Sequence, residues 1–257
     1  MADTSHVNKT HNVQNRSDAE WAVRRDLAAA YRLVALMGWD DLIFTHLSVR
    51  VPEQPYFLIN PYGFLFEEIT ASSLVKIDID GNKVDDTPHI VNPAGFVIHS
   101  AIHAARTDAH AVMHLHSNDG QAVSAQAGGL LPITQTSMLV WQKVAYHGYE
   151  GLATNLEERE RLVGDLGDKT CMLLRNHGTL TVGETVAAAF IRMYFLERAC
   201  TAQVRAQSGG GALNRATEES IAATAGAADM GLSLVGNGLL WPALIRKLDR
   251  TDPSYRD

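Results

Sequence analysis

Short apolar strands and helical segments alternate irregularly along this chain, and that order constrains its fold more than any other feature. Residues 74–84 alternate apolar and polar side chains around Asp80-Gly81, a dipeptide typical of hairpin turns. Two further apolar segments, 172–175 and 179–182, are separated only by Asn176-His177-Gly178. Because hairpins are interleaved with helical patterns, the sequence favours a mixed α/β domain over a simple βαβ array.

Helices are predicted from the spacing of apolar residues and from the residue types that begin or end helices. Ser17 and Glu20 have the spacing of a capping box, so a helix should begin there and end near Gly38. The other expected helices cover residues 94–106, 117–128 and 184–208. Additional strands are expected at residues 42–51, 56–60 and 111–115.

The two ends of the chain show weaker patterns. Residues 1–17 are polar and should form a flexible arm before a single domain at 18–257. The Ala- and Gly-rich stretch 221–236 has no clear periodicity. We therefore expect a less regular C-terminal extension over about residues 210–257.

Composition excludes several classes of protein. The formal net charge is -7, which gives no basic face for a nucleic acid. The two cysteines, Cys171 and Cys200, form no CxxC motif, so a reducing cytoplasm is expected rather than a disulfide framework. The polar N-terminus does not resemble a signal peptide, and no apolar run is long enough to cross a membrane. The expectation is a soluble, cytoplasmic protein with neither a nucleic-acid nor a membrane partner.

His114 and His116 lie two residues apart, directly after the apolar run 111–113. On a strand, such residues project from the same face, so both imidazoles can reach one ion. Metal–nitrogen distances near 2.0–2.1 Å require that convergence. The pattern by itself leaves two alternatives open, which are a pair of surface histidines and a pair of metal ligands.

His177 lies in the three-residue turn between two apolar strands, where Gly178 allows a positive φ. Either the imidazole caps its own loop, or a rigid strand–turn–strand unit delivers it as a third ligand. Three histidine ligands would leave coordination positions open for water or substrate. That arrangement is typical of catalytic rather than structural metal sites.

With these three histidines in view, the chain resembles the class II aldolase/adducin family over about residues 20–210. Its motifs resemble those of the adducin-like branch more closely than those of the sugar-phosphate aldolases. The resemblance rests on several stretches in the family's order: GWDDLIFTHLSVRVP, FLINPYGFLFEEITASSLVKID, NPAGFVIHSAIHAAR, AVMHLHSNDGQAVSA, LPIT, VAYHGYEG and LLRNHGTLTVGETVAAAF.

The resemblance implies a three-layer α/β/α domain with a mainly antiparallel central sheet. It also implies a divalent metal on His114, His116 and His177, with Zn²⁺ expected first and Mn²⁺ or Fe²⁺ as alternatives. The assembly would be a homotetramer with active sites near subunit interfaces. Enzymes of the family include sugar-phosphate aldolases, an epimerase, dehydratases, decarboxylases and a few non-haem iron oxygenases, whereas the adducins use the domain without known catalysis.

The chain departs from the aldolase pattern at the residues that handle protons and phosphate. The catalytic glutamate of those enzymes falls on Gly95, which cannot carry a proton. Their phosphate-binding Gly-Asn pair falls on Thr45-His46, and their second phosphate loop falls on residues 60–63. Since bulky side chains would narrow the pocket, an unphosphorylated substrate is expected. The expected substrate contacts are His46, Asn60, Tyr62, Gly63, Ser72 and Ser73.

A metal on three histidines can polarise a carbonyl group or a hydroxy or keto acid. That supports a lyase on a small hydroxy or keto acid or a sugar-like substrate, by aldol cleavage or by decarboxylation, which needs no base to begin. Candidate proton donors are His46, His147 and Tyr149. The alternatives are a non-haem iron oxygenase on the same fold and a non-catalytic, adducin-like binding or assembly module.

Overall fold

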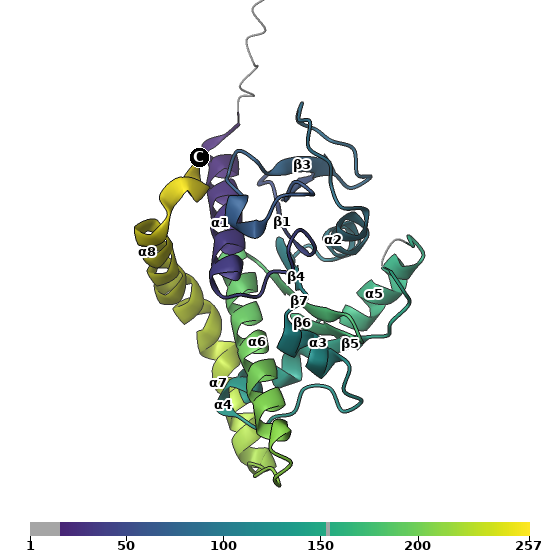
Figure 1. Cartoon of the computed structure of the whole chain (residues 1–257), viewed down its shortest axis with the longest axis vertical. Coiled ribbons are helices and arrows are strands. Elements are labelled where there is room, and N and C mark those ends of the chain that lie inside the picture. The colour runs from purple at the N-terminus through teal and green to yellow at the C-terminus, as the bar shows by residue number, and fades with distance from the viewer. Residues whose placement is uncertain (1–15, 153–154) are drawn as a thin grey trace, which may run out of the picture.

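A seven-stranded sheet forms the centre of the computed structural model, which describes residues 16–152 and 155–257. The strands are β1 (His46–Arg50), β2 (Tyr56–Ile59), β3 (Val75–Asp78), β4 (Ala111–Leu115), β5 (Val144–His147), β6 (Cys171–Leu174) and β7 (Gly178–Gly183). Their order is β3-β2-β1-β4-β7-β6-β5, and every neighbouring pair is antiparallel except β5 with β6. The predicted α/β class with a mainly antiparallel sheet is confirmed (Figure 1).

Helices cover both faces of this sheet. They are α1 (Asp18–Leu36), α2 (Pro93–Ala105), α3 (Asn118–Ser124), α4 (Gln135–Val140), α5 (Glu158–Leu166), α6 (Val186–Ser208), α7 (Glu218–Val235) and α8 (Trp241–Thr251). Figure 1 shows α1 and α6 on one side of the sheet and α2 and α5 on the other. The helix expected at 117–128 ends four residues early, at Ser124.

Alternation of side chains along β4 explains why both faces are covered. Ala111, Met113 and Leu115 pack into a core with residues of α1 and α6. Val112 points the opposite way, into a second core formed with α2 and α5. Every residue of β4 is buried, as expected for a strand enclosed between two helical layers. His114 therefore lies on the face that α2 and α5 cover.

The expected irregularity of the C-terminal residues 210–257 is wrong. This segment forms α7, a π-helical turn at Gly236–Leu240, and α8. Alanine favours helix by intrinsic propensity, so a helix can form without a strong apolar stripe. The C-terminal end returns to the domain, where Tyr255 is buried and the carbonyl oxygen of Asp257 accepts from the Ser72 N–H at 2.7 Å. Within the described part of the chain, no helix combines the length and apolarity needed to span a bilayer.

The expected N-terminal arm at 1–17 lies outside the described residues except for Arg16 and Ser17. Ser17 caps α1 as predicted, because its hydroxyl accepts from the Glu20 N–H at 3.1 Å. The Glu20 side chain does not complete the capping box. Its carboxylate accepts from Arg24 at 2.9 Å and from Lys76 at 3.0 Å, since two cations bind a carboxylate more strongly than one backbone N–H.

Arg24 is the centre of a buried ionic cluster that joins α1 to the segment around β3. Its side chain has no exposed surface. The guanidinium donates to Asp85 at 3.0 Å and to the carbonyl oxygen of Leu74 at 2.9 Å, in addition to Glu20. Lys76 completes the cluster by contacting both carboxylates. Each buried charge thus has an opposite charge beside it, which offsets the cost of desolvation.

Replacing Arg24 should reveal how strongly the fold depends on this cluster. Arg24→Met removes the fully buried cation and leaves Glu20 and Asp85 with Lys76 and the partly exposed Arg16, so the free energy of unfolding should fall by about 3–5 kcal/mol. The measurement is urea denaturation followed by circular dichroism. Arg25→Met is the matched control, because Arg25 is exposed and lies over the ring of Trp21; its cost should stay below about 1 kcal/mol.

Candidate metal centre and its cleft

Strand pairing brings the three histidines to the same end of the sheet. In the pairing of β4 with β7, Leu115 lies opposite Thr179, so the turn that carries His177 lies beside the end of β4. A Cβ atom added to Gly178 would lie 2.2 Å from the carbonyl oxygen of Leu115, so only glycine fits there. The expected positive φ is instead found at Asn176, with φ 57°.

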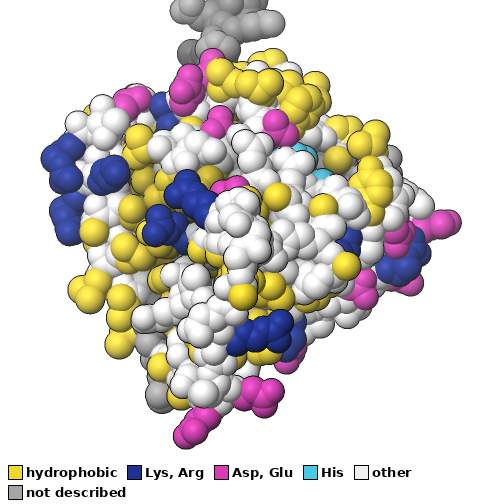
Figure 2. Space-filling model, turned by 60° about the horizontal axis from the view of Figure 1, so that its bottom comes forward, with side chains coloured by type: hydrophobic (Ala, Val, Ile, Leu, Met, Phe, Trp, Pro, Cys, Tyr) yellow, Lys and Arg dark blue, Asp and Glu magenta, His cyan; other side chains and the backbone are white. Residues whose placement is uncertain are grey.

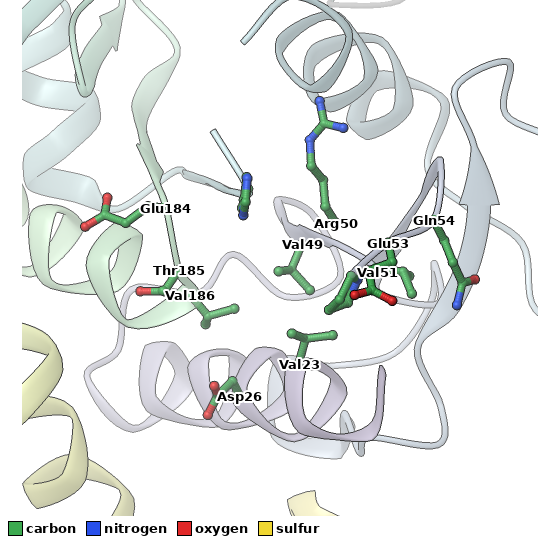
Figure 3. Close-up of a pocket in the computed structure, with 12 residues that line it drawn as sticks. Val23, Asp26, Val49, Arg50, Val51, Glu53, Gln54, Glu184, Thr185 and Val186 are labelled. Atoms are coloured by element: carbon green, nitrogen blue, oxygen red, sulfur yellow. The ribbon is translucent and has the colours of Figure 1, made fainter. Parts of the chain in front are cut away.

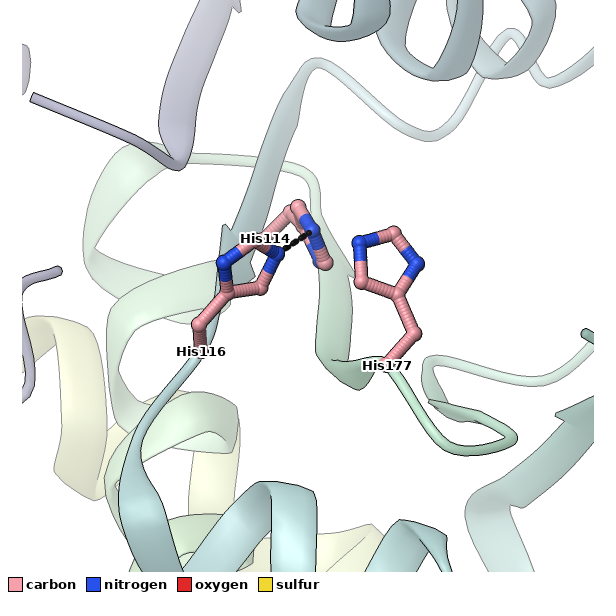
Figure 4. Close-up of side chains that lie close together, drawn as sticks. All are labelled: His114, His116 and His177. Atoms are coloured by element: carbon pink, nitrogen blue, oxygen red, sulfur yellow. Dashed lines mark hydrogen bonds between the residues drawn. The ribbon is translucent and has the colours of Figure 1, made fainter. Parts of the chain in front are cut away.

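The three imidazoles form a nearly equilateral triangle. The distances between ring centroids are 4.7 Å for His114–His116, 4.7 Å for His114–His177 and 4.8 Å for His116–His177. One nitrogen from each ring lies within 4.8 Å of the other two. Figure 4 shows His177 approaching from the turn to face the pair at the end of β4.

Two of the nitrogen atoms have nearly the spacing that one ion requires. Nε2 of His114 and Nε2 of His116 lie 3.0 Å apart. Two ligands at 2.05 Å from a tetrahedral ion would lie roughly 3.3 Å apart. His114 and His116 therefore fit one divalent cation after a small separation of their rings, and a nitrogen of His177 lies within 4.8 Å of both.

Hydrogen bonds on the far side of two rings leave the inward nitrogens unprotonated. Nδ1 of His114 donates to the carbonyl oxygen of Thr179 at 2.9 Å. Nδ1 of His116 donates to a carboxylate oxygen of Asp41 at 3.0 Å. In a neutral imidazole, each bond assigns the proton to Nδ1 and leaves the Nε2 lone pair free for a metal.

Burial keeps two imidazoles of the triad neutral. Desolvation, followed by the charges of His177, His116 and His46, holds the pKa of His114 well below its ordinary value. Desolvation and then the charge of His116 lower the pKa of His177 to about 4. Both imidazoles are neutral at pH 7, which is the form that binds a metal without first releasing a proton.

Glu197, on α6, binds two residues that lie next to the triad. It is 1 % exposed, and its carboxylate accepts from the hydroxyl of Thr179 at 2.6 Å and from that of Ser117. Thr179 supplies the carbonyl oxygen that orients His114, and Ser117 adjoins His116. Burial raises the pKa of Glu197 to about 6 despite these two hydrogen bonds. The Glu197 side chain thus fixes the position of residues next to two of the ligands.

The triad lies in the wall of a cleft of about 410 Å³. Its other walls are largely aromatic and apolar, and among the described residues that line it there is no Lys or Arg. On the face shown in Figure 2, histidine side chains reach the surface in one small area with hydrophobic side chains on either side. The aromatic and apolar lining residues include Phe44, Tyr62, Pro93, Ile98, Tyr149 and Leu152.

Only some of the residues expected to contact substrate or to donate protons line this cleft. His46, Tyr62 and Tyr149 do so. Asn60 is buried instead against the hydroxyl of Tyr31, at 2.8 Å. The others that do not line it are Gly63, Ser72, Ser73 and His147.

These residues have local roles that explain their positions. The hydroxyl of Ser73 donates to the carbonyl oxygen of Thr70 within a tight turn, at 2.9 Å. Ser72 contacts Thr70 in the same turn, and Gly63 has the positive φ of a turn residue, 103°. His147 is buried against α5, with its ring nitrogens 2.7 Å from Asp165 and 3.2 Å from Glu158.

Thr45 is a cleft residue whose importance sequence reasoning missed. Its φ is 69°, a left-handed conformation that a β-branched residue rarely adopts. Its hydroxyl is buried and has no hydrogen-bond partner among the described residues. A strained residue with an unpaired polar atom in a cleft is typical of a binding site. The signal in the sequence is that the family's glycine, which adopts this φ without strain, falls here.

The ring of His46 occupies the space beside Gly95. A Cβ atom added to Gly95 would lie 2.7 Å from Cδ2 of His46. The two departures from the aldolase pattern are therefore one structural feature, because a side chain at position 95 would collide with the imidazole at position 46. The cleft has a histidine where the aldolases would have a glutamate.

A larger cleft, of about 540 Å³, lies at the opposite end of the same strands. Figure 3 shows it between α1, the end of β1 and the start of α6. Its charged lining residues include Asp26, Arg50 and Glu53. None of the three histidine ligands lines it. The smaller cleft, which contains all three, is therefore the candidate functional site.

Comparison with known proteins finds the same family in sequence and in structure. The family model for the Class II Aldolase and Adducin N-terminal domain matches residues 25–204. The crystal structure of an aldolase II superfamily protein from Pseudomonas syringae is 56% identical and has a TM-score of 0.89, covering 94% of this chain and 97% of that one. An L-fuculose 1-phosphate aldolase from Glaciozyma antarctica is 30% identical with a TM-score of 0.82, covering 93% of each chain. Rattus norvegicus alpha-adducin is 46% identical over 196 residues, which are 75% of this chain and 26% of the adducin.

Acid should destabilise the metal-free protein because buried histidines must remain neutral. Desolvation lowers the pKa of His103 to about 3, so between that value and about pH 6.5 the unfolded chain binds a proton that the folded chain excludes. From about pH 7.5 to 5.5, the unfolding free energy should fall by about 1.4 kcal/mol for this residue. His103→Phe should reduce the pH-dependent loss by that amount in urea titrations, whereas the exposed His110→Phe should not.

Removing the Asp41 carboxylate should weaken metal binding without removing a ligand. Asp41→Asn replaces the anion that holds the proton on Nδ1 of His116, so affinity for Zn²⁺ should fall by about 10–100-fold. Competition titration with a chromophoric chelator measures that change. Asp40→Asn is the neighbouring control, and equal losses in both variants would contradict the role assigned to Asp41.

Proposed function

The chain belongs to the class II aldolase and adducin family, and from that premise we propose that it is a divalent-metal-dependent lyase. The proposed substrate is a small hydroxy or keto acid, or a sugar-like compound, without a phosphate group. The observation that carries the proposal is the convergence of three imidazoles in the wall of a cleft. A site of that kind leaves coordination positions open for a substrate.

His114, His116 and His177 would hold the metal, with Zn²⁺ as the proposed ion. Imidazole nitrogens without thiolate or carboxylate ligands suit zinc, and Mn²⁺ or Fe²⁺ are the alternatives that metal analysis separates. When bound, the ion supplies Lewis-acid chemistry to a substrate oxygen. Thr179 and Asp41 fix the directions of two ligand lone pairs. The Thr45 hydroxyl is a donor for a polar substrate atom.

The lining of the cleft supports a substrate without phosphate. Phosphate recognition in proteins usually relies on Arg, Lys or several backbone N–H groups. No Lys or Arg is present among the described residues of the lining, whereas Phe44, Tyr62 and Tyr149 offer aromatic surface. The similar aldolase from Glaciozyma antarctica is named for a phosphorylated sugar. We therefore propose a different substrate class for this chain, with an apolar or aromatic group opposite the metal.

A homotetramer in the cytoplasm is the proposed assembly and location. Leu234 and Leu239 are 78% and 68% exposed near the junction of α7 and α8. Apolar side chains of this size on a helical surface favour burial against another subunit. The two cysteines are free and buried, which is compatible with a reducing compartment.

An adducin-like binding or assembly module is the second candidate. The observations that favour it are the similarity to alpha-adducin and the glycine at position 95. A third candidate, a non-haem iron oxygenase, would use the same three ligands. The three functions differ in whether turnover occurs and whether it requires oxygen.

The test is metal analysis of protein purified without added metal, followed by a screen of hydroxy and keto acids under air and under argon. We expect about one equivalent of metal per chain and turnover under argon. His177→Ala should lower both metal affinity and turnover by at least about 100-fold, whereas the exposed His110→Ala should change neither. Oxygen-dependent turnover would select the oxygenase. Only traces of metal, unchanged by His177→Ala, would overturn the metal assignment.

A further inference from the structure

Four buried polar side chains form a continuous hydrogen-bonded chain that begins at the cleft and ends inside the domain. Nδ1 of His46 lies 2.8 Å from Nε2 of His99, and Nδ1 of His99 lies 2.5 Å from the hydroxyl of Ser48. The same hydroxyl lies 2.7 Å from Nε2 of His103. Nδ1 of His103 lies 3.1 Å from the carbonyl oxygen of Ala109. All four side chains are at most 3% exposed.

The last contact fixes the direction of every bond in this chain. A carbonyl oxygen only accepts, so His103 must donate through Nδ1 and accept through Nε2. Ser48 has one proton, which it donates to His103, and it therefore accepts from Nδ1 of His99. Nε2 of His99 is then an acceptor, and His46 must donate to it through Nδ1.

This order leaves Nε2 of His46 with a lone pair. His46 lines the cleft, and its ring centroid lies 5.2 Å from that of His114. No hydrogen bond among the described residues uses its Nε2 atom. The same ring covers Gly95, where the aldolases would have their glutamate.

We propose that His46 is the catalytic base of this site, and that His99, Ser48 and His103 are positioning residues that keep its Nε2 unprotonated and directed at the substrate. This inference rests on the proposed lyase function and narrows it to aldol cleavage. The chain ends at a carbonyl oxygen rather than at solvent. It therefore selects one tautomer of His46 rather than conducting protons away.

The proton balance explains why a base favours aldol cleavage. Nε2 of His46 accepts the proton of the substrate hydroxyl, and the oxygen electrons form a carbonyl as the adjacent carbon–carbon bond breaks. The electron pair of that bond remains on the other fragment as an enolate. The imidazolium then returns its proton to the enolate carbon, which restores neutral His46 and releases two carbonyl-containing fragments with no net change of charge. Decarboxylation removes no proton from the substrate, so Nε2 of His46 would still be unprotonated when the enolate forms. It could not then donate the proton that the enolate carbon needs.

Nitrogen-15 NMR of histidine ring-labelled, metal-free protein tests the tautomer directly. The His46 signals are identified by their loss in His46→Phe. We expect a protonated Nδ1 and an unprotonated Nε2 for His46 in the wild type. Ser48→Ala interrupts the chain, so His46 should change to the other tautomer or to an averaged mixture. Ser100→Ala is the matched control, because Ser100 is equally buried and donates only within its own helix, to Val97.

Turnover separates this inference from the function on which it rests. His46→Phe should lower kcat by about 10²–10⁴-fold on a substrate found by the screen. Ser48→Ala should lower kcat by at least about tenfold with little change in KM, as expected when a base has the wrong tautomer. His103→Phe provides a second interruption if Ser48→Ala folds poorly.

Three results would overturn the inference. A protonated Nε2 on His46 in the wild type, with turnover intact, would remove the base role and leave the lyase function standing. No turnover of any acid would overturn the lyase function and the base role together, while the NMR pattern would still decide whether the chain sets the tautomer. Coordination of His46 to added Zn²⁺ would also exclude it as the base.

Discussion

The pairing of β4 with β1 on one side and with β7 on the other is the constraint on which the whole site depends. It places His46 directly opposite His114, and it brings the turn that carries His177 to the end of the same strand. Gly178 allows this because its missing side chain lets the backbone approach the carbonyl oxygen of Leu115. A one-residue slip of β4 would turn His114 to the opposite face of the sheet.

Features that depend on neighbours along the chain could be predicted from the sequence. The strand at residues 111–115 and the cap at Ser17 follow from local patterns, and both are found. The two histidines on one strand face were predicted as candidate ligands from their spacing alone. By contrast, the helical C-terminal segment was missed because alanine-rich helices can form with little apolar periodicity.

Features that depend on contacts between distant residues could not be predicted in this way. Asp41 reaches His116 across 75 positions, and Glu197 reaches Ser117 across 80. A carboxylate in the sequence carries no sign of which imidazole or hydroxyl it will meet. Glu20 illustrates the same limit, since its local spacing predicted a capping box and its actual partners include Lys76, 56 positions away. The substitution at Gly95 was visible in the sequence, but the imidazole that fills its place was not.

The hydrogen-bonded chain that begins at His46 ends at the carbonyl oxygen of Ala109. That end affects how variants of this protein should be compared. It determines where a hydrogen atom resides on a ring more than 60 positions earlier in the sequence, without requiring any heavy atom to move. Hydrogen atoms are invisible to X-ray crystallography at ordinary resolution. Two variants with superimposable electron density would therefore differ in chemistry, and structural identity alone would be a poor guide to whether the site is intact.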